Sequence, residues 1–387
     1  MKRISAIFSL LVLGIGLVAL VASCAPAATP TPAPTSPPAA TKAPAPAATS
    51  APAPTTPPTA APKAAAPTPR PLIKAKAGMN MSTSNTPFWI GIERGYYKEI
   101  GLDIELVTVQ TGPDTIPPLS TGEMLIAAGA IGAAHFNAVL RDIPIKMVLA
   151  SNTSQQGQSD STGFLVRKDL IDSGKVKEIK DLKGLTIGIA SLASASEIAT
   201  DLMLAQGGLK PGDVNKVTMA MPDMVAALAN KSIDVSMNVE PALTQAEDLG
   251  VAVLKWKVSD VASPFQWGAN NLSPVLWQKN PDLARDFAVA HLRAIRDYAD
   301  AMGPKKKDRA AVLNYMVKYS SEKNVAVLEK LRPAGVNPDG LNYVDSIGRQ
   351  LDWYTTQGVV KQPMKVTDIV DNSYAEYALS KLGKYQP

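Results

Sequence analysis

The sequence contains one cysteine, Cys24, and two histidines, His135 and His291. A single cysteine excludes a disulfide within the chain, and neither histidine has a cysteine or another histidine close to it in the sequence. Zinc sites need several such ligands, so we predict no metal site and no cofactor. The sequence also lacks a nucleophile elbow and a recognisable Ser–His–Asp order, and we predict that the protein is not an enzyme.

Cys24 lies at the end of an apolar N-terminal stretch. Two basic residues precede residues 7–20, which carry no charge, and two small residues come directly before the cysteine. The apolar stretch is shorter than the roughly 20 residues that span a bilayer, so we predict that residues 1–23 form a signal peptide. The ending resembles the lipobox of bacterial lipoproteins, in which the cysteine is acylated and becomes the new N-terminus. This resemblance implies a protein anchored by lipid on Cys24, such as palmitate, at the extracytoplasmic face of the cell membrane. The alternative is an ordinary secretory signal that contains a cysteine.

Residues 25–70 consist almost entirely of Ala, Pro, Thr and Ser, with three charges and no aromatic or large aliphatic side chain. Such a stretch cannot offset its ordering entropy by burial, so we predict that it is disordered. Its prolines favour extended polyproline II, which at about 3.1 Å per residue reaches up to roughly 140 Å. We assign residues 24–72 to the lipidated cysteine and a linker. The alternative, a proline-rich ligand for a recognition domain, lacks a fixed motif.

The remaining residues have room for two domains, and the overall composition, 46% hydrophobic and 19% charged, is typical of globular proteins. The net charge of +5 is spread along the chain. Its one local run, Lys305–Lys307, is followed directly by Asp308, which indicates a solvated turn rather than a nucleic-acid patch. We predict a monomer that does not bind nucleic acid.

Strand and helix patterns alternate through most of the remaining chain. The predicted strands are 78–81, 102–107, 124–128, 185–190, 217–220 and 234–238, and the predicted helices are 87–97, 195–206, 223–230 and one that begins at residue 114. Such alternation predicts an α/β fold with mostly parallel sheets flanked by helices. After about residue 273 only helices are predicted, for example 281–301. We therefore predict two lobes, with lobe 1 in residues 73–164 and 266–387 and lobe 2 in residues 165–265. The chain should cross between them near residues 161–168 and 265–272.

Five segments then carry a family resemblance. They are Phe88–Asp103, Leu119–Glu123, Asp181–Gly188, Gly208–Val214 and Asp234–Pro241. In this order and spacing they resemble the solute-binding proteins that serve importers of nitrate, sulfonates, taurine and thiamine precursors. The resemblance covers about residues 78–300. It implies a periplasmic-binding-protein-like fold of type II, whose lobes close on a ligand in a cleft. It also implies delivery of that ligand to an ABC permease powered by a cytoplasmic ATPase.

The loops that follow the predicted strands are the candidate ligand site, because ligands of open parallel sheets bind at the carboxyl ends of strands and in clefts between domains. We predict ligand contacts by Asn85, Thr86, Trp89, Asn152, Ser191, Ser194, Asn238, Glu240 and Trp267. The loops contain no lysine or arginine. Their hydroxyl, amide and carboxylate groups suit a neutral, hydrogen-bonding ligand. Phe88 and Trp89 on one side, and Phe265 and Trp267 on the other, would stack on a flat ring. The alternatives are that Trp89 is a core residue and that Glu240 only caps a helix.

The lipobox, the linker and an uncharged cleft with aromatic residues resemble the riboflavin-binding lipoproteins of this family, so riboflavin is the predicted ligand. A pyrimidine precursor of thiamine ranks second as the ligand, and an aliphatic sulfonate, taurine or nitrate ranks third. A related eukaryotic branch synthesises the thiamine pyrimidine, but that chemistry requires a cysteine-rich stretch, which this sequence lacks. A structural or adhesive lipoprotein would not need the predicted hinge and cleft.

Overall fold

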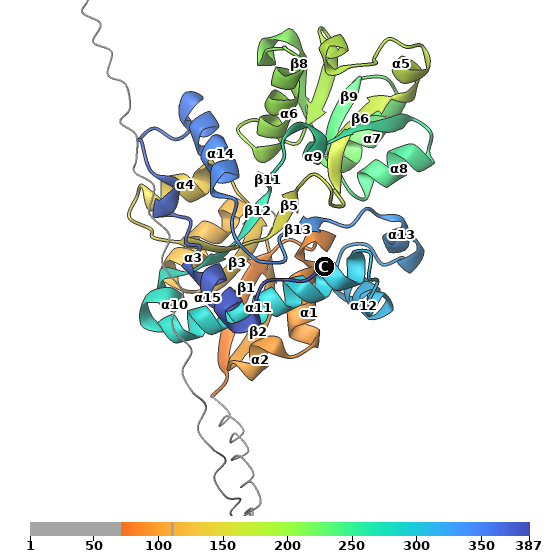
Figure 1. The fold of residues 1–387 in the computed structure, drawn as a ribbon. Helices are drawn as coiled ribbons and strands as arrows, with labels where there is room; N and C mark the ends of the chain where they lie inside the picture. Colours follow the sequence, from red (N-terminus) through yellow and green to blue (C-terminus); the bar gives the residue numbers. More distant parts are fainter. Residues whose placement is uncertain (1–70, 110–111) are drawn as a thin grey trace, which may run out of the picture. The chain divides into compact units, whose positions relative to one another are not determined.

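The computed structural model of the protein describes residues 71–109 and 112–387. The predicted signal peptide, Cys24 and the linker as far as residue 70 lie outside the described residues. Two five-stranded sheets and one three-stranded sheet organise this part of the chain (Figure 1). Among the described residues, no helix is long and apolar enough to cross a membrane.

The first sheet has the strand order β2-β1-β3-β12-β4. Its strands are β1 (Ile73–Met79), β2 (Leu102–Thr108), β3 (Ile126–Ala130), β4 (Lys146–Ala150) and β12 (Gly268–Leu272). β1 is parallel to β2 and β3, whereas β12 is antiparallel to both β3 and β4. Four strands therefore run in one direction and β12 runs in the other. We call this sheet and its helices lobe 1.

The second sheet repeats this design with the order β10-β6-β9-β7-β8. Its strands are β6 (Thr162–Arg167), β7 (Thr186–Ile189), β8 (Asn215–Thr218), β9 (Val235–Val239) and β10 (Ala252–Lys257). Here β6 is the reversed strand, since it is antiparallel to β9 and β10 while β7 is parallel to β8 and β9. We call this sheet and its helices lobe 2. The predicted α/β fold with mostly parallel sheets is confirmed, with one reversed strand in each sheet.

Helices accompany both sheets. In lobe 1 these are α1 (Thr86–Glu93), α2 (Tyr96–Glu99), α3 (Ile116–Thr121), α4 (Ala133–Val139), α10 (Pro274–Lys279), α11 (Pro281–Met302), α12 (Arg309–Tyr319), α13 (Val325–Lys330) and α15 (Ser373–Leu382). In lobe 2 they are α5 (Lys168–Asp172), α6 (Ala195–Gln206), α7 (Met221–Ala229), α8 (Ala242–Asp248) and α9 (Val258–Val261). Short 3-10 helices are η1 (Thr83–Asn85), η2 (Gly112–Thr115), η3 (Ile179–Leu182), η4 (Pro211–Asp213) and η5 (Val366–Asp368). α14 (Val344–Thr356) contacts α4 of lobe 1 and α6 of lobe 2.

Between the two large sheets lies the hinge sheet, formed by β5 (Asn152–Ser154), β11 (Phe265–Gln266) and β13 (Gly335–Val336) (Figure 1). β5 pairs antiparallel with both β11 and β13. The predicted lobe boundary between residues 164 and 165 falls inside β6, all of which belongs to the second sheet. The outgoing crossing therefore consists of β5 and the loop after it. β13 also corrects the expectation of helices only after residue 273, since a strand of two residues is too short to show a hydrophobic pattern.

Local sequence signals explain which helix predictions succeed. The predicted helix 195–206 is confirmed as α6, because Ser194 caps it by accepting a hydrogen bond from the backbone N–H of Glu197. The predicted helix 87–97 is instead divided into α1 and α2. Gly95 adopts φ 73°, a left-handed conformation that ends α1 before α2 begins. β1 begins at Ile73, earlier than predicted, because its small alanines between lysines do not stand out as a hydrophobic pattern.

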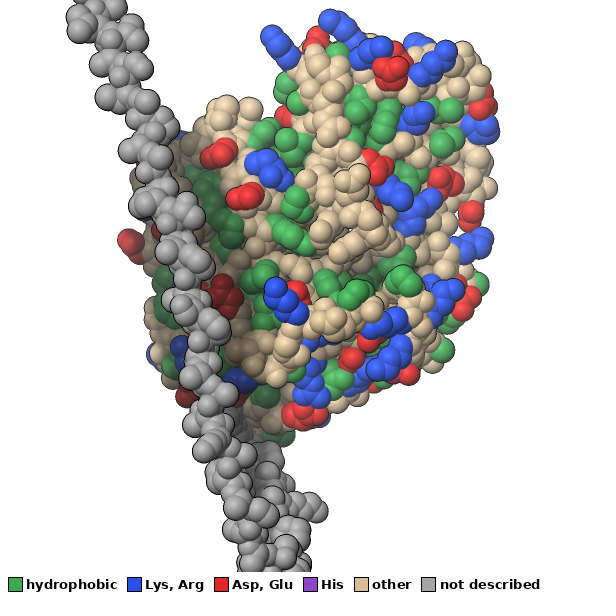
Figure 2. All heavy atoms as spheres, in the orientation of Figure 1, with side chains coloured by type: hydrophobic (Ala, Val, Ile, Leu, Met, Phe, Trp, Pro, Cys, Tyr) green, Lys and Arg blue, Asp and Glu red, His purple; other side chains and the backbone are tan. Residues whose placement is uncertain are grey.

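Surface charges are interspersed rather than segregated on the face drawn in Figure 2. The basic run Lys305–Lys307 lies in the exposed turn between α11 and α12, as predicted. Lys305 donates a hydrogen bond to Asp300 at 3.0 Å, so part of the positive charge of the run is compensated locally.

Gln266 of β11 is completely buried. Its hydrogen bonds hold the segment that returns the chain to lobe 1 against α14. Its backbone N–H donates to Ser346 Oγ at 2.9 Å, and its carbonyl accepts from Gln350 Nε2 at 2.8 Å. Its side chain donates to Gly268 O and Asn342 Oδ1 and accepts from the backbone N–H of Tyr343. Both the main chain and the side chain of one residue therefore hold the hinge sheet against the residues that start α14.

Both histidines are buried. His291 packs between Phe88 and Phe287, and its Nδ1 lies 2.7 Å from the hydroxyl oxygen of Tyr97. Burial lowers the pKa of His291 to about 3 and that of His135 to about 4. The rings therefore stay neutral in the folded protein at pH values where histidines of the unfolded chain are already protonated.

We expect the free energy of unfolding to fall as the pH drops from 7 to 5. Unfolded histidine titrates near pH 6.5 while the buried rings do not, so each histidine lowers the free energy of unfolding by about 2 kcal/mol at pH 5. Urea unfolding at a series of pH values measures this change. A His291→Phe variant should be less stable at pH 7, because Tyr97 loses its partner, and should also show a weaker pH dependence. A free energy of unfolding that is constant between pH 7 and pH 5 would contradict the prediction.

Candidate ligand-binding cleft

The carboxyl ends of the majority strands of both sheets lie next to the hinge sheet. β4 ends at Ala150 and leads through β5 to Thr162, which pairs with Val239 at the carboxyl end of β9. The return crossing enters β12 at Gly268, which pairs with Ala130 at the carboxyl end of β3. Both crossings therefore join the edges at which ligands of α/β sheets bind. This topology places the predicted ligand loops of both lobes around the same hinge.

A cavity of 540 Å³ lies between the lobes, and we call it the interlobe cavity. Lobe 2 contributes residues of α8 and the preceding Pro241, and lobe 1 contributes residues from Glu322 to Leu331 around α13. The backbone N–H of Ser321 donates to Met81 O, so this flank of lobe 1 also contacts the loop after β1. The volume lies within the range of about 300–1,000 Å³ that is usual for small-molecule sites.

Next to this cavity, Glu240 forms an ion pair that joins the lobes. The Glu240 side chain is almost completely buried, and its Oε1 accepts a hydrogen bond from Arg332 Nη1 at 2.9 Å. Its Oε2 accepts from the backbone N–H of Thr244 at 3.1 Å, and Arg332 Nη2 also binds Glu247 Oε2. Glu240 and Glu247 come from lobe 2, whereas Arg332 lies between α13 and β13.

The predicted absence of cations from this region is therefore wrong. The strand-end loops contain no basic residue, but the fold brings Arg332 to Glu240 from 92 positions away in the sequence. No local sequence signal could have identified this pair. Glu240 does contact the first turn of α8, as the capping alternative proposed, and in addition it carries the ion pair.

A second charged cluster lies at the start of α6, beside the predicted Ser191–Ser194 loop. Lys216 Nζ lies 2.8 Å from Glu197 Oε1 and 2.5 Å from Asp201 Oδ1, and all three side chains are about nine-tenths buried. Glu197 Oε2 also accepts from the backbone N–H of Ala193 at 2.8 Å. From α14, Trp353 Nε1 donates to Asp201 Oδ2 at 3.1 Å. This hydrogen bond is a second polar contact between lobe 2 and the C-terminal part of the chain.

Several predicted contact residues order the loops themselves. Asn85 donates from Nδ2 to the carbonyl oxygen of Asn80, and Thr86 donates from Oγ1 to Thr83 O. Asn238 is buried and donates to Met221 O. Of the other polar predicted residues, Ser191 is exposed, while Asn152 and Ser194 are half-buried. These three side chains are the most accessible to a solute in this conformation.

The two indoles do not face each other across a gap. Trp89 is completely buried in lobe 1 and stacks on Tyr319 with ring centroids 5.8 Å apart. Trp267 lies where the hinge sheet meets lobe 1, donates from Nε1 to Ser154 Oγ at 2.8 Å, and contacts Phe265. The expectation that they stack on a ring from opposite sides is wrong, because Trp89 is completely buried against Tyr319 inside lobe 1. Ligand contact by either residue remains a prediction.

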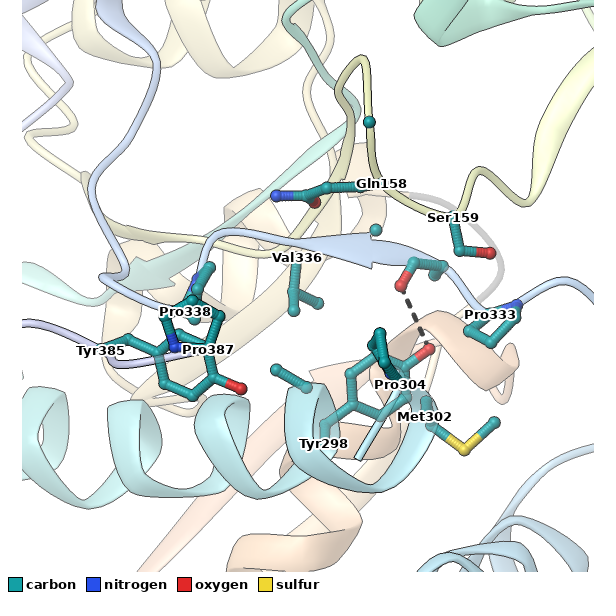
Figure 3. A pocket seen from close by; sticks show the side chains of 15 residues that line it. Gln158, Ser159, Tyr298, Met302, Pro304, Pro333, Val336, Pro338, Tyr385 and Pro387 are labelled. Atoms are coloured by element: carbon teal, nitrogen blue, oxygen red, sulfur yellow. Dashed lines mark hydrogen bonds between the residues drawn. The ribbon is translucent and has the colours of Figure 1, made fainter. Parts of the chain in front are cut away.

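Another cavity, of 480 Å³, lies on the lobe 1 side of the hinge (Figure 3). Tyr298 and Met302 of α11 line it, together with Val336 of β13 and the crossing residues Gln158 and Ser159. The Tyr298 hydroxyl donates to Ala334 O at 3.2 Å, shown as a dashed line in Figure 3. None of its lining residues belongs to the lobe 2 sheet or its helices, whereas both lobes line the interlobe cavity. None of the nine predicted contact residues lines the interlobe cavity.

Residues 82–301 match the family described as NMT1/THI5 like. The chain belongs to this family. The matched range covers all of lobe 2 and most of α11, but it excludes Arg332 and α14. The ion pairs of Arg332 and the hydrogen bond from Trp353 to Asp201 therefore each involve a residue beyond the matched range.

Relatives of the chain include named solute-binding proteins. The riboflavin-binding protein RibY of Chloroflexus aurantiacus is 26% identical over 297 residues, which cover 74% of this chain and 73% of RibY. The taurine-binding periplasmic protein of Escherichia coli is 25% identical over 211 residues, 52% of this chain and 60% of that protein. The crystal structure of the periplasmic nitrate-binding protein NrtA from Synechocystis PCC 6803 has a TM-score of 0.63 at 15% identity, with coverage of 81% and 89%. The predicted family resemblance and the two-lobe fold are thereby confirmed.

We expect a Trp89→Ala substitution to lower the free energy of unfolding by about 3–5 kcal/mol, because it removes a fully buried indole from its contact with Tyr319. Trp89→Phe should cost less, since it keeps an aromatic ring there and removes an N–H that has no hydrogen-bond partner among the described residues. Urea unfolding of the three proteins measures both effects. A Trp89→Ala protein within 1 kcal/mol of the wild type would show that the indole does not pack as described.

Proposed function

We propose that this protein is the substrate-binding component of an ABC import system, which captures a small solute by lobe closure and delivers it to a membrane permease. One observation carries the proposal: the carboxyl edges of two similarly built sheets meet at a three-stranded hinge, beside a cavity lined by both lobes. The named functions of RibY and the taurine-binding relative support it. The permease and its ATPase are the proposed partners, and the protein acts as a monomer.

The contacts between the lobes suit a reversible closure. Outside the hinge they include the ion pairs of Arg332 and the hydrogen bond from Trp353 to Asp201. Partly exposed ion pairs contribute modestly to stability, because water solvates the charges well when they separate. Arg332 is 30% exposed, so water already reaches part of its guanidinium, while its partner Glu240 is almost completely buried in this conformation.

We propose riboflavin as the ligand, with a pyrimidine precursor of thiamine, and then taurine, a sulfonate or nitrate, as alternatives. RibY supports riboflavin, and the taurine-binding relative is the reason to keep a sulfonate among the alternatives. The polar groups at the strand ends, with Ser191 and Asn152 the most accessible of those named above, suit the ring carbonyls and hydroxyls of a vitamin.

We also propose that lipid on Cys24 holds the protein at the extracytoplasmic face of the membrane and that the following linker separates it from the bilayer. The lipobox-like ending supports this anchor. Stable membrane binding needs more than one acyl chain, and a diacylated cysteine satisfies that requirement.

The ligand proposal is tested by titrating purified protein with riboflavin while following flavin fluorescence, with thermal unfolding as a second readout. We expect quenching at micromolar or lower protein concentration and a rise in melting temperature, because a ligand that binds only the folded state stabilises it. Taurine, nitrate and a pyrimidine are compared in the same thermal assay. Stabilisation by taurine or nitrate without any effect of riboflavin would contradict the ligand proposal while leaving the importer assignment intact.

The anchor proposal is tested with a Cys24→Ser variant of the full chain expressed in a bacterial host. We expect the wild type to incorporate labelled palmitate and to sediment with membranes, and the variant to do neither. A Ser36→Ala variant, which changes a residue of the linker and keeps the cysteine and the residues before it, serves as a control. Equal palmitate labelling of the wild type and the Cys24→Ser variant would exclude Cys24 as the acceptor.

A further inference from the structure

The cations of the two charged clusters described above are each bound by two carboxylates. Arg332 contacts Glu240 and Glu247, which leaves this group of three with a net charge of −1. Lys216 contacts Glu197 and Asp201, which gives a second group with a net charge of −1. Neither group therefore provides an excess positive charge for an anionic solute.

The hydrogen-bond geometry of Arg332 strengthens this point. Arginine binds carboxylates, sulfonates and phosphates best through two parallel N–H groups of its guanidinium. Here Nη1 donates to Glu240 and Nη2 donates to Glu247, so each terminal nitrogen already has a carboxylate of lobe 2 as its partner. The positive charge of the guanidinium is thus already offset by two carboxylates, of which Glu240 is almost completely buried.

The interlobe cavity itself has the same charge balance. Its charged lining residues are Asp248, Glu322 and Lys330, and Lys330 Nζ lies 3.2 Å from Asp248 Oδ2. One lysine and two carboxylates again give a net charge of −1. Like charges brought together at an interface oppose binding, so the cavity and the neighbouring Arg332 group both act against an anion.

We propose that Glu240 and Glu247 determine the specificity of this protein by occupying the guanidinium of Arg332, so that the cleft excludes anionic solutes and accepts neutral ones. The inference rests on the proposed solute-binding function and narrows its ligand class. It also reassigns Glu240 from a ligand contact to the counter-ion of Arg332. Arg332 lies outside residues 82–301, the range that matches the family, whereas Glu240 and Glu247 lie inside it.

The test uses the double variant Glu240→Gln/Glu247→Gln, which keeps the shape of both side chains and removes both charges from Arg332. A control double variant, Asp172→Asn/Glu178→Gln, removes the same number of charges from lobe 2. Asp172 and Glu178 are exposed and pair with Lys168 and Lys180. They follow the end of β6 and precede β7, so they lie at the edge of the second sheet opposite the hinge.

Calorimetric titration and thermal unfolding are carried out with two alkanesulfonates, nitrate and riboflavin. We expect no measurable binding of nitrate or the sulfonates to the wild type or to the control. The Glu240→Gln/Glu247→Gln protein should gain sulfonate binding at least about tenfold tighter than the wild-type limit. Circular dichroism confirms that each variant is folded.

The inference is overturned if the wild type binds a sulfonate or nitrate at micromolar concentration, or if the folded double variant gains no anion affinity. Failure of the proposed function has a different signature, in which no solute of either charge class stabilises the wild type. Even then, a gain of anion binding by the double variant, absent from the control, supports the assignment of Glu240 and Glu247.

Discussion

The hydrogen bonds of Gln266 are the constraint on which the relation between the two lobes depends. A two-residue strand has little capacity to hold a hinge by main-chain pairing alone, yet β11 must carry the chain back into lobe 1. Gln266 solves this by bonding to Ser346, Gln350, Asn342 and Tyr343 around the start of α14. Buried polar groups are costly when unpaired, so this network favours one arrangement of crossing and helix. α14 in turn reaches α6 of lobe 2 through Trp353. The hinge and one contact between the lobes are thus parts of one connected structure.

On the other side of the hinge, ion pairs of Arg332 join the two lobes. The Arg332 group and the Trp353–Asp201 contact lie on different helices of lobe 2, α8 and α6, so the lobes are joined on two flanks of the hinge. Both contacts are polar, whereas the core of lobe 1 is apolar and includes Trp89, Phe88 and Tyr97. Polar contacts can exchange protein partners for water at modest cost, while apolar cores resist opening because their surface would be exposed. Opening would separate these polar contacts and also part of a hydrophobic cluster that includes Phe136 of lobe 1, Ile198 of lobe 2 and Tyr354 of α14.

Sequence reasoning predicted the features that are encoded locally. The extent of α6 followed from its Ser194 cap and the glycines after Gln206, and the turn at Lys305–Lys307 followed from its composition. Sequence reasoning failed for contacts between residues that are far apart in the sequence. Arg332 pairs with Glu240 only because β13 returns to the hinge, and β13 is too short to be recognised. The burial of Trp89 against Tyr319 depends likewise on the packing of α12 on α1, which no pattern within either helix records. The topology of the site was therefore predictable, and its charge balance was not.

The pairing of β5 with β11 has a consequence for how this chain can be divided. Phe265 lies opposite Ser154 and Gln266 opposite Thr153, so the segment that builds lobe 2 leaves and re-enters the hinge at adjacent positions. Lobe 2 is thus one continuous segment inserted into lobe 1, and its two ends lie next to each other. A short turn between β5 and β11, or the lobe 2 of a relative, could therefore replace this segment without changing the path of the chain in lobe 1.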